Sequence, residues 1–138
     1  MKQRQSERGA VAVEFALLLP VLLLLVIGIM EFGRAYNVQI SASQAGREGA
    51  RYVAVNYANP GFSAGTATSM ALAAAPALPA AGTSVNISYS TASGAPLGGC
   101  AAGATVTVRV VNQLTWLTGY LSIPAPAITG IGVMQCGG

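Results

Sequence analysis

Hydrophobic residues form one unbroken stretch near the N-terminus, between Ala10 and Met30. Glu14 is its single charged residue, and apolar side chains would occupy every face of a helix built from it. At about 1.5 Å per residue, such a helix would extend roughly 31 Å, which matches a hydrocarbon core of about 30 Å. Pro20 does not exclude a span, because membrane helices tolerate proline where neighbours satisfy the freed carbonyl. The pattern predicts a membrane-spanning helix rather than an amphipathic surface helix.

A helical spacing continues beyond this stretch, from Glu31 to Tyr57, where no proline occurs. Small and apolar residues recur there every three or four positions: Ala35, Val38, Ala42, Ala45, Gly49 and Tyr52. We therefore expect one long helix, from about Ala10 to Ala54 or Val55, half in the membrane and half in water. A glycine weakens such a helix by about 1 kcal/mol relative to alanine, so we expect its glycines to admit a closely packed neighbour. These glycines are Gly33, Gly46 and Gly49.

A turn and a second, shorter helix are predicted next. Asn59-Pro60-Gly61 is a turn signal. The alanine-rich stretch from Thr66 to Ala75 predicts a short helix, which Pro76 and Pro79 would close.

Beyond Gly82 the hydrophobic period changes to two, which is typical of strands with one buried face. In the first segment, Val85, Ile87 and Tyr89 alternate with Asn86 and Ser88. In the second, Val106, Val108 and Val110 alternate with Thr105, Thr107 and Arg109. In the third, Ile131 and Val133 alternate with Gly130, Gly132 and Met134. These segments predict an antiparallel sheet of about three strands. A Gly-rich loop (residues 94–103) and a longer connection with Trp116 and Tyr120 (residues 114–126) would separate the strands.

Together these elements predict an α+β fold, with the long N-terminal helix packed on the small sheet. Three short strands cannot bury a face alone, so the aqueous half of the helix is the expected cover. The expected organisation is a basic leader (residues 1–9), a transmembrane helix (10–30) and an outer domain (31–138). The outer domain would hold the helix continuation (31–57), the short helix (66–75) and the β region (83–135).

The charge of the N-terminal tail predicts the orientation of the span. The tail contains three basic residues, Lys2, Arg4 and Arg8, and one acidic residue, Glu7, so its net charge is +2. Positive flanks stay in the cytoplasm, so the C-terminal part should lie outside the cytoplasmic membrane. A cleaved secretory signal is the weaker alternative, because the apolar stretch exceeds about 15 residues and no A-x-A-like site follows it. An uncleaved anchor is the stronger alternative, because it explains the span and the orientation. It does not explain why Gly9 stands at the boundary with Glu14 five residues further on.

The composition excludes most catalytic chemistry. The chain has no His and no Asp, and beyond Arg51 its single charged side chain is Arg109. Glu48 is the last residue with a carboxylate side chain, so residues 49–138 contain no paired carboxylates, no histidine metal site and no Ser-His-Asp arrangement. No phosphate-binding glycine motif opens a predicted helix. We expect no enzyme, no cofactor and no small-molecule substrate. The net charge of +3 comes mostly from the tail, so it indicates topology rather than a nucleic-acid partner.

Cys100 and Cys136 both fall in the predicted outer domain. An even number of cysteines in an oxidising compartment favours a disulfide, and the chain-entropy argument gives it about 4 kcal/mol of stabilisation. Two free thiols or a bridge to another subunit remain alternatives. A metal site is not expected from two cysteines without His or Asp.

Several segments resemble the TadE-like proteins, the pseudopilins or minor pilins of the tight-adherence (Flp) subclass of type IV pilus systems. The resemblance rests on Arg8–Leu17, Pro20, Gly28–Arg34 and Ala45–Tyr52, and more loosely on Ile128–Met134. It is dense over residues 8–55. The major Flp pilins are shorter and commonly carry Glu-Tyr where this chain has Glu14-Phe15, which favours a minor subunit. Larger TadG-like relatives add an adhesin-type domain, which we do not expect in this chain.

The resemblance implies a type IV pilin-like fold and a defined processing route. An aspartic prepilin peptidase would cut between Gly9 and Ala10, which leaves Glu14 at the fifth position. A secretion-type ATPase and a polytopic platform protein would then move the subunit from the bacterial inner membrane into or onto the pilus, among other pilins and minor pilins. The resulting role would be pilus assembly, and through it surface adhesion and biofilm formation.

The residue chemistry fits this route. Gly9 has no side chain, so an extended tail could enter a protease cleft closely. Cleavage would give Ala10 a free, cationic amine, and Glu14 would lie roughly 6 Å further along the helix. A carboxylate buried between helices is costly unless it is paired, so the amine of an adjacent subunit is the expected partner. Snorkelling of Glu14 to the interface is the alternative.

Other polar and aromatic residues carry weaker signals. Arg47, Glu48 and Arg51 could form a docking patch for a partner pilin, although such charges are more often a solvated helix face. Tyr52 and Trp116 are expected to cover the core or the sheet rather than to bind a ligand. Against the pilin interpretation stands a second one, an uncleaved, single-pass anchored domain with a binding or sensory role outside the membrane.

Overall fold

A computed structural model describes residues 3–79, 81–117, 119 and 124–137, with side chains from Gly9 onward. Tyr120 and Lys2 lie outside the described residues, and the side chains of Arg4, Glu7 and Arg8 are not described. The chain divides into two units, Met1–Arg34 and Ala35–Gly138. Each unit is described by itself below.

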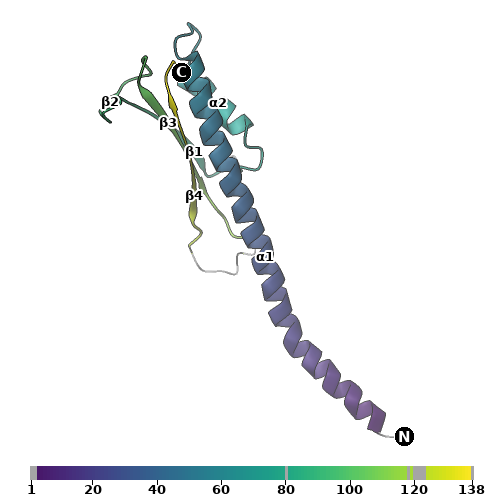
Figure 1. Ribbon diagram of the computed structural model, residues 1–138. Coiled ribbons are helices and arrows are strands. Elements are labelled where there is room, and N and C mark those ends of the chain that lie inside the picture. The colour runs from purple at the N-terminus through teal and green to yellow at the C-terminus, as the bar shows by residue number, and fades with distance from the viewer. Residues whose placement is uncertain (1–2, 80, 118, 120–123, 138) are drawn as a thin grey trace. The chain divides into compact units, whose positions relative to one another are not determined.

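Helix α1 (Gln3–Asn56) passes through both units (Figure 1). It begins before the predicted start at Ala10, because the residues between Gln3 and Arg8 include no helix breaker and several good helix formers. Within the described residues, α1 is the one helix that is long and apolar enough to cross a membrane. Its part in Met1–Arg34 exposes the large apolar side chains that the predicted span contains, such as Leu17 and Leu24.

In the unit Ala35–Gly138, the rest of α1 buries one face. The predicted stripe of small residues is confirmed, since Val38, Ala42 and Ala45 are buried and Tyr52 is half-buried. Further buried positions on this face are Ala50, Val53 and Ala54. The small side chains allow the sheet to approach the helix axis closely, which no stripe of leucines would permit.

Helix α2 (Ala64–Ala73) lies two residues nearer the N-terminus than predicted. Ser63 caps it, because its side-chain oxygen accepts a hydrogen bond from the backbone N–H of Thr66 at 3.1 Å. Ala67 and Ala71 are fully buried. The turn between the two helices places the ring of Phe62 against that of Tyr52, with centroids 6.5 Å apart.

The sheet has four antiparallel strands in the order β2-β1-β3-β4. They are β1 (Thr83–Ser90), β2 (Pro96–Leu97), β3 (Thr105–Gln113) and β4 (Ala127–Gln135). The predicted α+β fold is confirmed, with one addition. The loop predicted over residues 94–103 contains β2, which pairs with the end of β1 through Tyr89 and Ser90. A strand of two residues is too short to show a hydrophobic period in the sequence.

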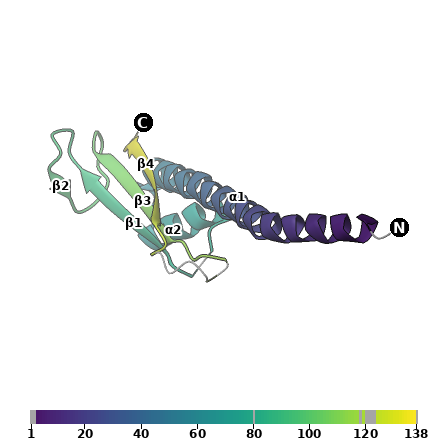
Figure 2. The ribbon, with the colours of Figure 1, turned by 90° about the horizontal axis from the view of Figure 1, so that it is seen from below.

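One face of the sheet is covered and the other is open. Figure 2 shows α2 and the α1 residues of this unit on the same side of the strands. Toward that side β3 directs Val106, Val108 and Val110, all fully buried, and β1 directs Val85 and Ile87. Alternation in β1 and β3 is therefore as predicted. The open face carries Arg109 and polar residues of β1.

In β4 the alternation is reversed. Gly130 and Gly132 face the helix and are buried, whereas Ile131 and Val133 are exposed to 50% and 58%. Ile128 is the one large apolar residue of this strand that is buried, since Met134 stays 37% exposed. The reason is the close approach of α1, which leaves no room for side chains at Gly130 and Gly132.

The contact between α1 and β4 is made by backbone atoms. A Cβ placed on Gly132 would overlap the carbonyl group of Gly46, and one on Gly130 would overlap the carbonyl group of Ala42. A Cβ on Gly46 would lie 2.8 Å from the backbone nitrogen of Gly132. Gly49 meets Val108 and Ala71 instead. The predicted use of Gly46 and Gly49 for close packing is confirmed. At Gly33, by contrast, no described atom lies within 4 Å of the place where a Cβ would stand.

Strand β4 runs alongside α1 in the same direction (Figure 1). Gly130 lies at Ala42, Gly132 lies at Gly46, and the N–H of Gly137 donates to the carbonyl of Ala54 at 3.2 Å. These contacts set the register of the strand against the helix.

Candidate functional site

The predicted cleavage position lies within helix α1. Gly9 and Ala10 are both helical and exposed, and no described atom lies within 4 Å of the place where a Cβ on Gly9 would stand. A protease that reads an extended chain must first unwind this turn. Glycine lowers that barrier, because it stabilises a helix by about 1 kcal/mol less than alanine does.

Glu14 is an exposed residue one helical turn beyond Ala10. Residues four apart share a helix face, so the backbone nitrogen of Ala10 and the carboxylate lie on the same side of α1. Glu14 has no hydrogen-bond or ion-pair partner in the part of the chain that is described. If the carboxylate is buried in a membrane or an assembly, none of the described side chains is placed to pair with it.

The three charged residues of the possible docking patch lie on α1, away from its buried face. Glu48 and Arg51 are together, with 3.9 Å between Oε2 and Nε, and both side chains are well exposed. Exposed pairs of this kind contribute about 0–1 kcal/mol. Arg47 is exposed and has no ion-pair partner among the described residues. Its charge is therefore not offset by the neighbouring carboxylate, which faces Arg51.

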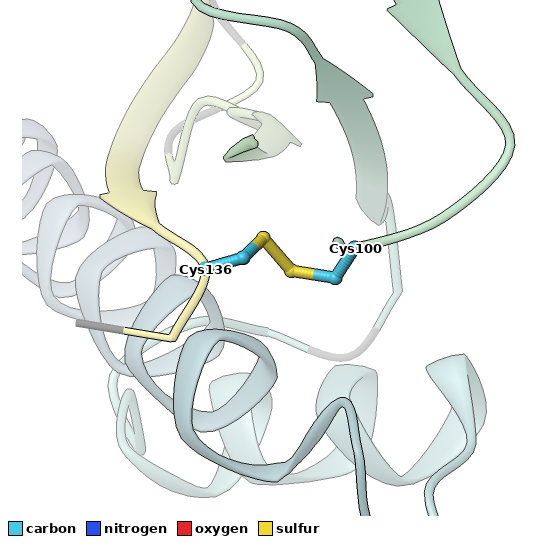
Figure 3. Close-up of a disulfide and its surroundings, with 2 residues drawn as sticks. All are labelled: Cys100 and Cys136. Atoms are coloured by element: carbon cyan, nitrogen blue, oxygen red, sulfur yellow. A yellow bond between two sulfur atoms is a disulfide. The ribbon is translucent and has the colours of Figure 1, made fainter. Parts of the chain in front are cut away.

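A disulfide joins Cys100 and Cys136, with their Cα atoms 5.9 Å apart (Figure 3). Cys136 follows β4 and is 1% exposed, whereas Cys100 lies in the loop between β2 and β3. The N–H of Cys136 also donates to the carbonyl of Ala104 at 2.7 Å. The bond ties the end of the edge strand to the loop that leads into β3.

The described residues offer no catalytic arrangement. They contain no group of three or more His, Cys, Asp or Glu side chains that could hold a metal ion. Burial raises the pKa of the Tyr89 hydroxyl above its ordinary value of 10.0, so this group stays protonated at neutral pH and cannot serve as a base. Tyr52 packs against the core, and Trp116 is half-buried.

Comparison with protein families identifies the N-terminal part of the chain. Residues 9–51 match the family model of TadE-like proteins. The resemblance seen in the sequence is thereby confirmed over this segment. It is less than half of the chain. Comparison with curated proteins and with solved structures gave no significant match.

The TadE-like segment holds most of the features described above. It begins at Gly9 and includes Glu14, Gly46 and the charged residues up to Arg51. TadE-like proteins are structural components of Tad pili rather than enzymes, so the match suggests a Tad pilus-associated minor pilin. The long apolar helix α1 suggests a single-pass membrane anchor, which is consistent with a pilus-associated protein.

The hydrophobic pattern does not point to the two residues that fix the helix on the sheet. Gly130 and Gly132 were expected to alternate with the apolar positions, and no role was predicted for them. The available signal was the pair of glycines two apart in a strand, because glycine inside a strand often marks close approach of another backbone.

Proposed function

We propose that the chain is a TadE-like pseudopilin that a prepilin peptidase processes after Gly9 and that is needed to assemble Flp-type pili. The match over residues 9–51 carries this proposal, because it starts at the cleavage position and spans the helix that anchors the subunit. The composition supports it as well, since the chain has no His and no Asp and no carboxylate side chain after Glu48. Adhesion and biofilm formation would follow from the assembled pilus.

In this proposal the basic leader stays in the cytoplasm and residues 31–138 lie in the periplasm or outside the cell. The excess of Lys and Arg before the span supports this orientation. The peptidase, other pilins, a secretion-type ATPase and a platform protein are the partners. The subunit binds no nucleic acid and no small molecule.

Processing can be tested on the full-length protein in membranes. Co-expression with an active prepilin peptidase is expected to give a protein that begins at Ala10, because Gly9 lies next to that bond and exposes it to the enzyme. N-terminal sequencing and intact mass measure the result. An inactive peptidase is the control, and should leave the leader in place. A start at Met1 with the active enzyme would contradict processing and favour an uncleaved anchored domain with a binding or sensory role.

Glu14 is proposed to pair with the new amine of an adjacent subunit. Glu14→Gln is expected to be cleaved normally but to enter pili about tenfold less, which corresponds to ~1.4 kcal/mol for a lost charge pair. Quantitative immunoblotting of sheared pili against membranes measures incorporation. Glu48→Gln is the matched control, because its carboxylate faces Arg51 at the surface. Equal incorporation of Glu14→Gln and the unchanged chain would rule out the pairing.

A further inference from the structure

Strand β4 forms one edge of the sheet, since it has β3 as its single partner in the strand order. Along an edge strand, one residue directs its backbone N–H and C=O toward the adjacent strand and the next residue directs them away from the sheet. The N–H of Cys136 donates to Ala104, and the carbonyl of Pro126 accepts from Leu114, so even-numbered residues bond to β3. The odd-numbered residues of β4 therefore direct their N–H and C=O groups outward.

One outward group is covered and the others are not. The side chain of Gln39 donates from Nε2 to the carbonyl of Thr129 at 3.1 Å, which confirms the outward direction at this residue. Beyond it, the backbone groups of Ile131, Val133 and Gln135 have no partner among the described residues. Their side chains are exposed. An open edge thus extends from Ile131 to Gln135.

This edge lacks the usual protection against strand pairing. Proteins commonly cover such edges or mark them with lysine, proline or a bulge. β4 contains no charged residue and no proline, and it pairs with β3 in one continuous register without a bulge. A five-residue open edge that contains Ile131, Val133 and Met134 is suited to accept another strand.

A positively charged residue, Arg47, has its backbone beside β4. The backbone of Arg47 adjoins Gly132, since its nitrogen would be 2.5 Å from a Cβ at that glycine. On a helix, Arg47 shares a side with Gln39 and Ser43, and Gln39 reaches the outward carbonyl of Thr129. The guanidinium of Arg47 is exposed and is not offset by Glu48, which pairs with Arg51.

We propose that the edge from Ile131 to Gln135 binds an extended strand of another protein, and that this strand carries a carboxylate that faces Arg47. Backbone hydrogen bonds would supply the affinity and the charge pair would set the register. A second copy of this chain fits less well, because every residue after Glu48 lacks a carboxylate side chain. The inference does not depend on cleavage after Gly9.

The test uses the full-length protein in detergent micelles and two synthetic peptides. Both peptides alternate Val and Thr; one has a central Glu and the other a Lys at that position. The Glu peptide is expected to bind about fivefold more tightly, by fluorescence anisotropy. It should also slow amide hydrogen exchange at Ile131, Val133 and Gln135. Arg47→Glu should reverse the preference, whereas the matched change Arg51→Glu should leave the Glu peptide favoured.

Three results would overturn the proposal. The first is unchanged amide exchange at the three outward residues with saturating peptide. The second is equal affinity for the two peptides in the unchanged chain, or a preference that Arg47→Glu does not alter. The third is protection of the same amides that rises with protein concentration without any peptide, which would assign the edge to a second copy of the chain.

Discussion

Replacing Cys100 and Cys136 with alanine is expected to lower the free energy of unfolding by about 4 kcal/mol. The two residues close a loop with a sequence separation of 36, and the chain-entropy argument gives that value for a loop of this length. The loss should be close to the full amount because Cys136 is buried beside α1 and β3 and cannot relax toward solvent. Urea unfolding of the full-length chain in detergent, followed by Trp fluorescence, measures the difference.

Reduction of the disulfide distinguishes the effect of losing the cross-link from the effect of replacing the cysteine side chains. Dithiothreitol should destabilise the unchanged protein by a similar amount, since both sulfurs remain in place. The double alanine variant should not respond to dithiothreitol. A loss below about 1 kcal/mol in both experiments would mean that the cross-link does not constrain the unfolded chain.

Gly132→Ala is expected to destabilise the unit Ala35–Gly138 by about 3 kcal/mol. The added methyl group would meet the carbonyl of Gly46, and a backbone inside a helix cannot move aside as a flexible side chain can. The helix must then shift away from β4, which weakens the packing of Ala42 and Ala45 as well. A fall of about 10 °C or more in the midpoint of thermal unfolding is the expected readout.

Gly98→Ala is the matched control for this change. Gly98 has no atom within 4 Å of the position of a Cβ, and its backbone is not in the left-handed region. The free energy of unfolding of the Gly98→Ala variant should lie within about 0.5 kcal/mol of that of the unchanged chain. Gly130→Ala should resemble Gly132→Ala, because it would meet the carbonyl of Ala42. Normal stability of both β4 variants would show that the helix adapts to a side chain at this contact.

The parts of the fold that sequence could predict are those with a local period. The alternation of Val106, Val108 and Val110 fixes which face of β3 is buried, and small residues at helical spacing fix the buried face of α1. Strand β2 does not follow from the hydrophobic pattern, because two residues carry no period and their pairing with β1 depends on the turn at residues 91–95. The start of α1 was misplaced because the polar residues before Gly9 form helix as readily as the apolar ones after it.

For β4, the rule that apolar residues face the core gave the wrong side. That rule assumes that side chains fill the space between strand and helix. Here the helix backbone takes that space, so Gly130 and Gly132 are the residues that fit and Ile131 and Val133 are left outside. Of the candidate site, Gly9, Ala10 and Glu14 were named from the sequence alone, because their meaning lies in spacing along one helix. The open edge of β4 could not be named, because it depends on strand order.

The parallel course of α1 and β4 has a mechanical consequence. Tension applied along α1 acts parallel to β4, because contacts from Gly130 to Gly137 follow the helix from Ala42 to Ala54. Such a load shears β4 along β3, so the hydrogen bonds of the two nine-residue strands resist together instead of opening one after another. The disulfide at Cys136 anchors the far end of the same strand. The unit Ala35–Gly138 is thus built to resist stretching along the axis of its own helix.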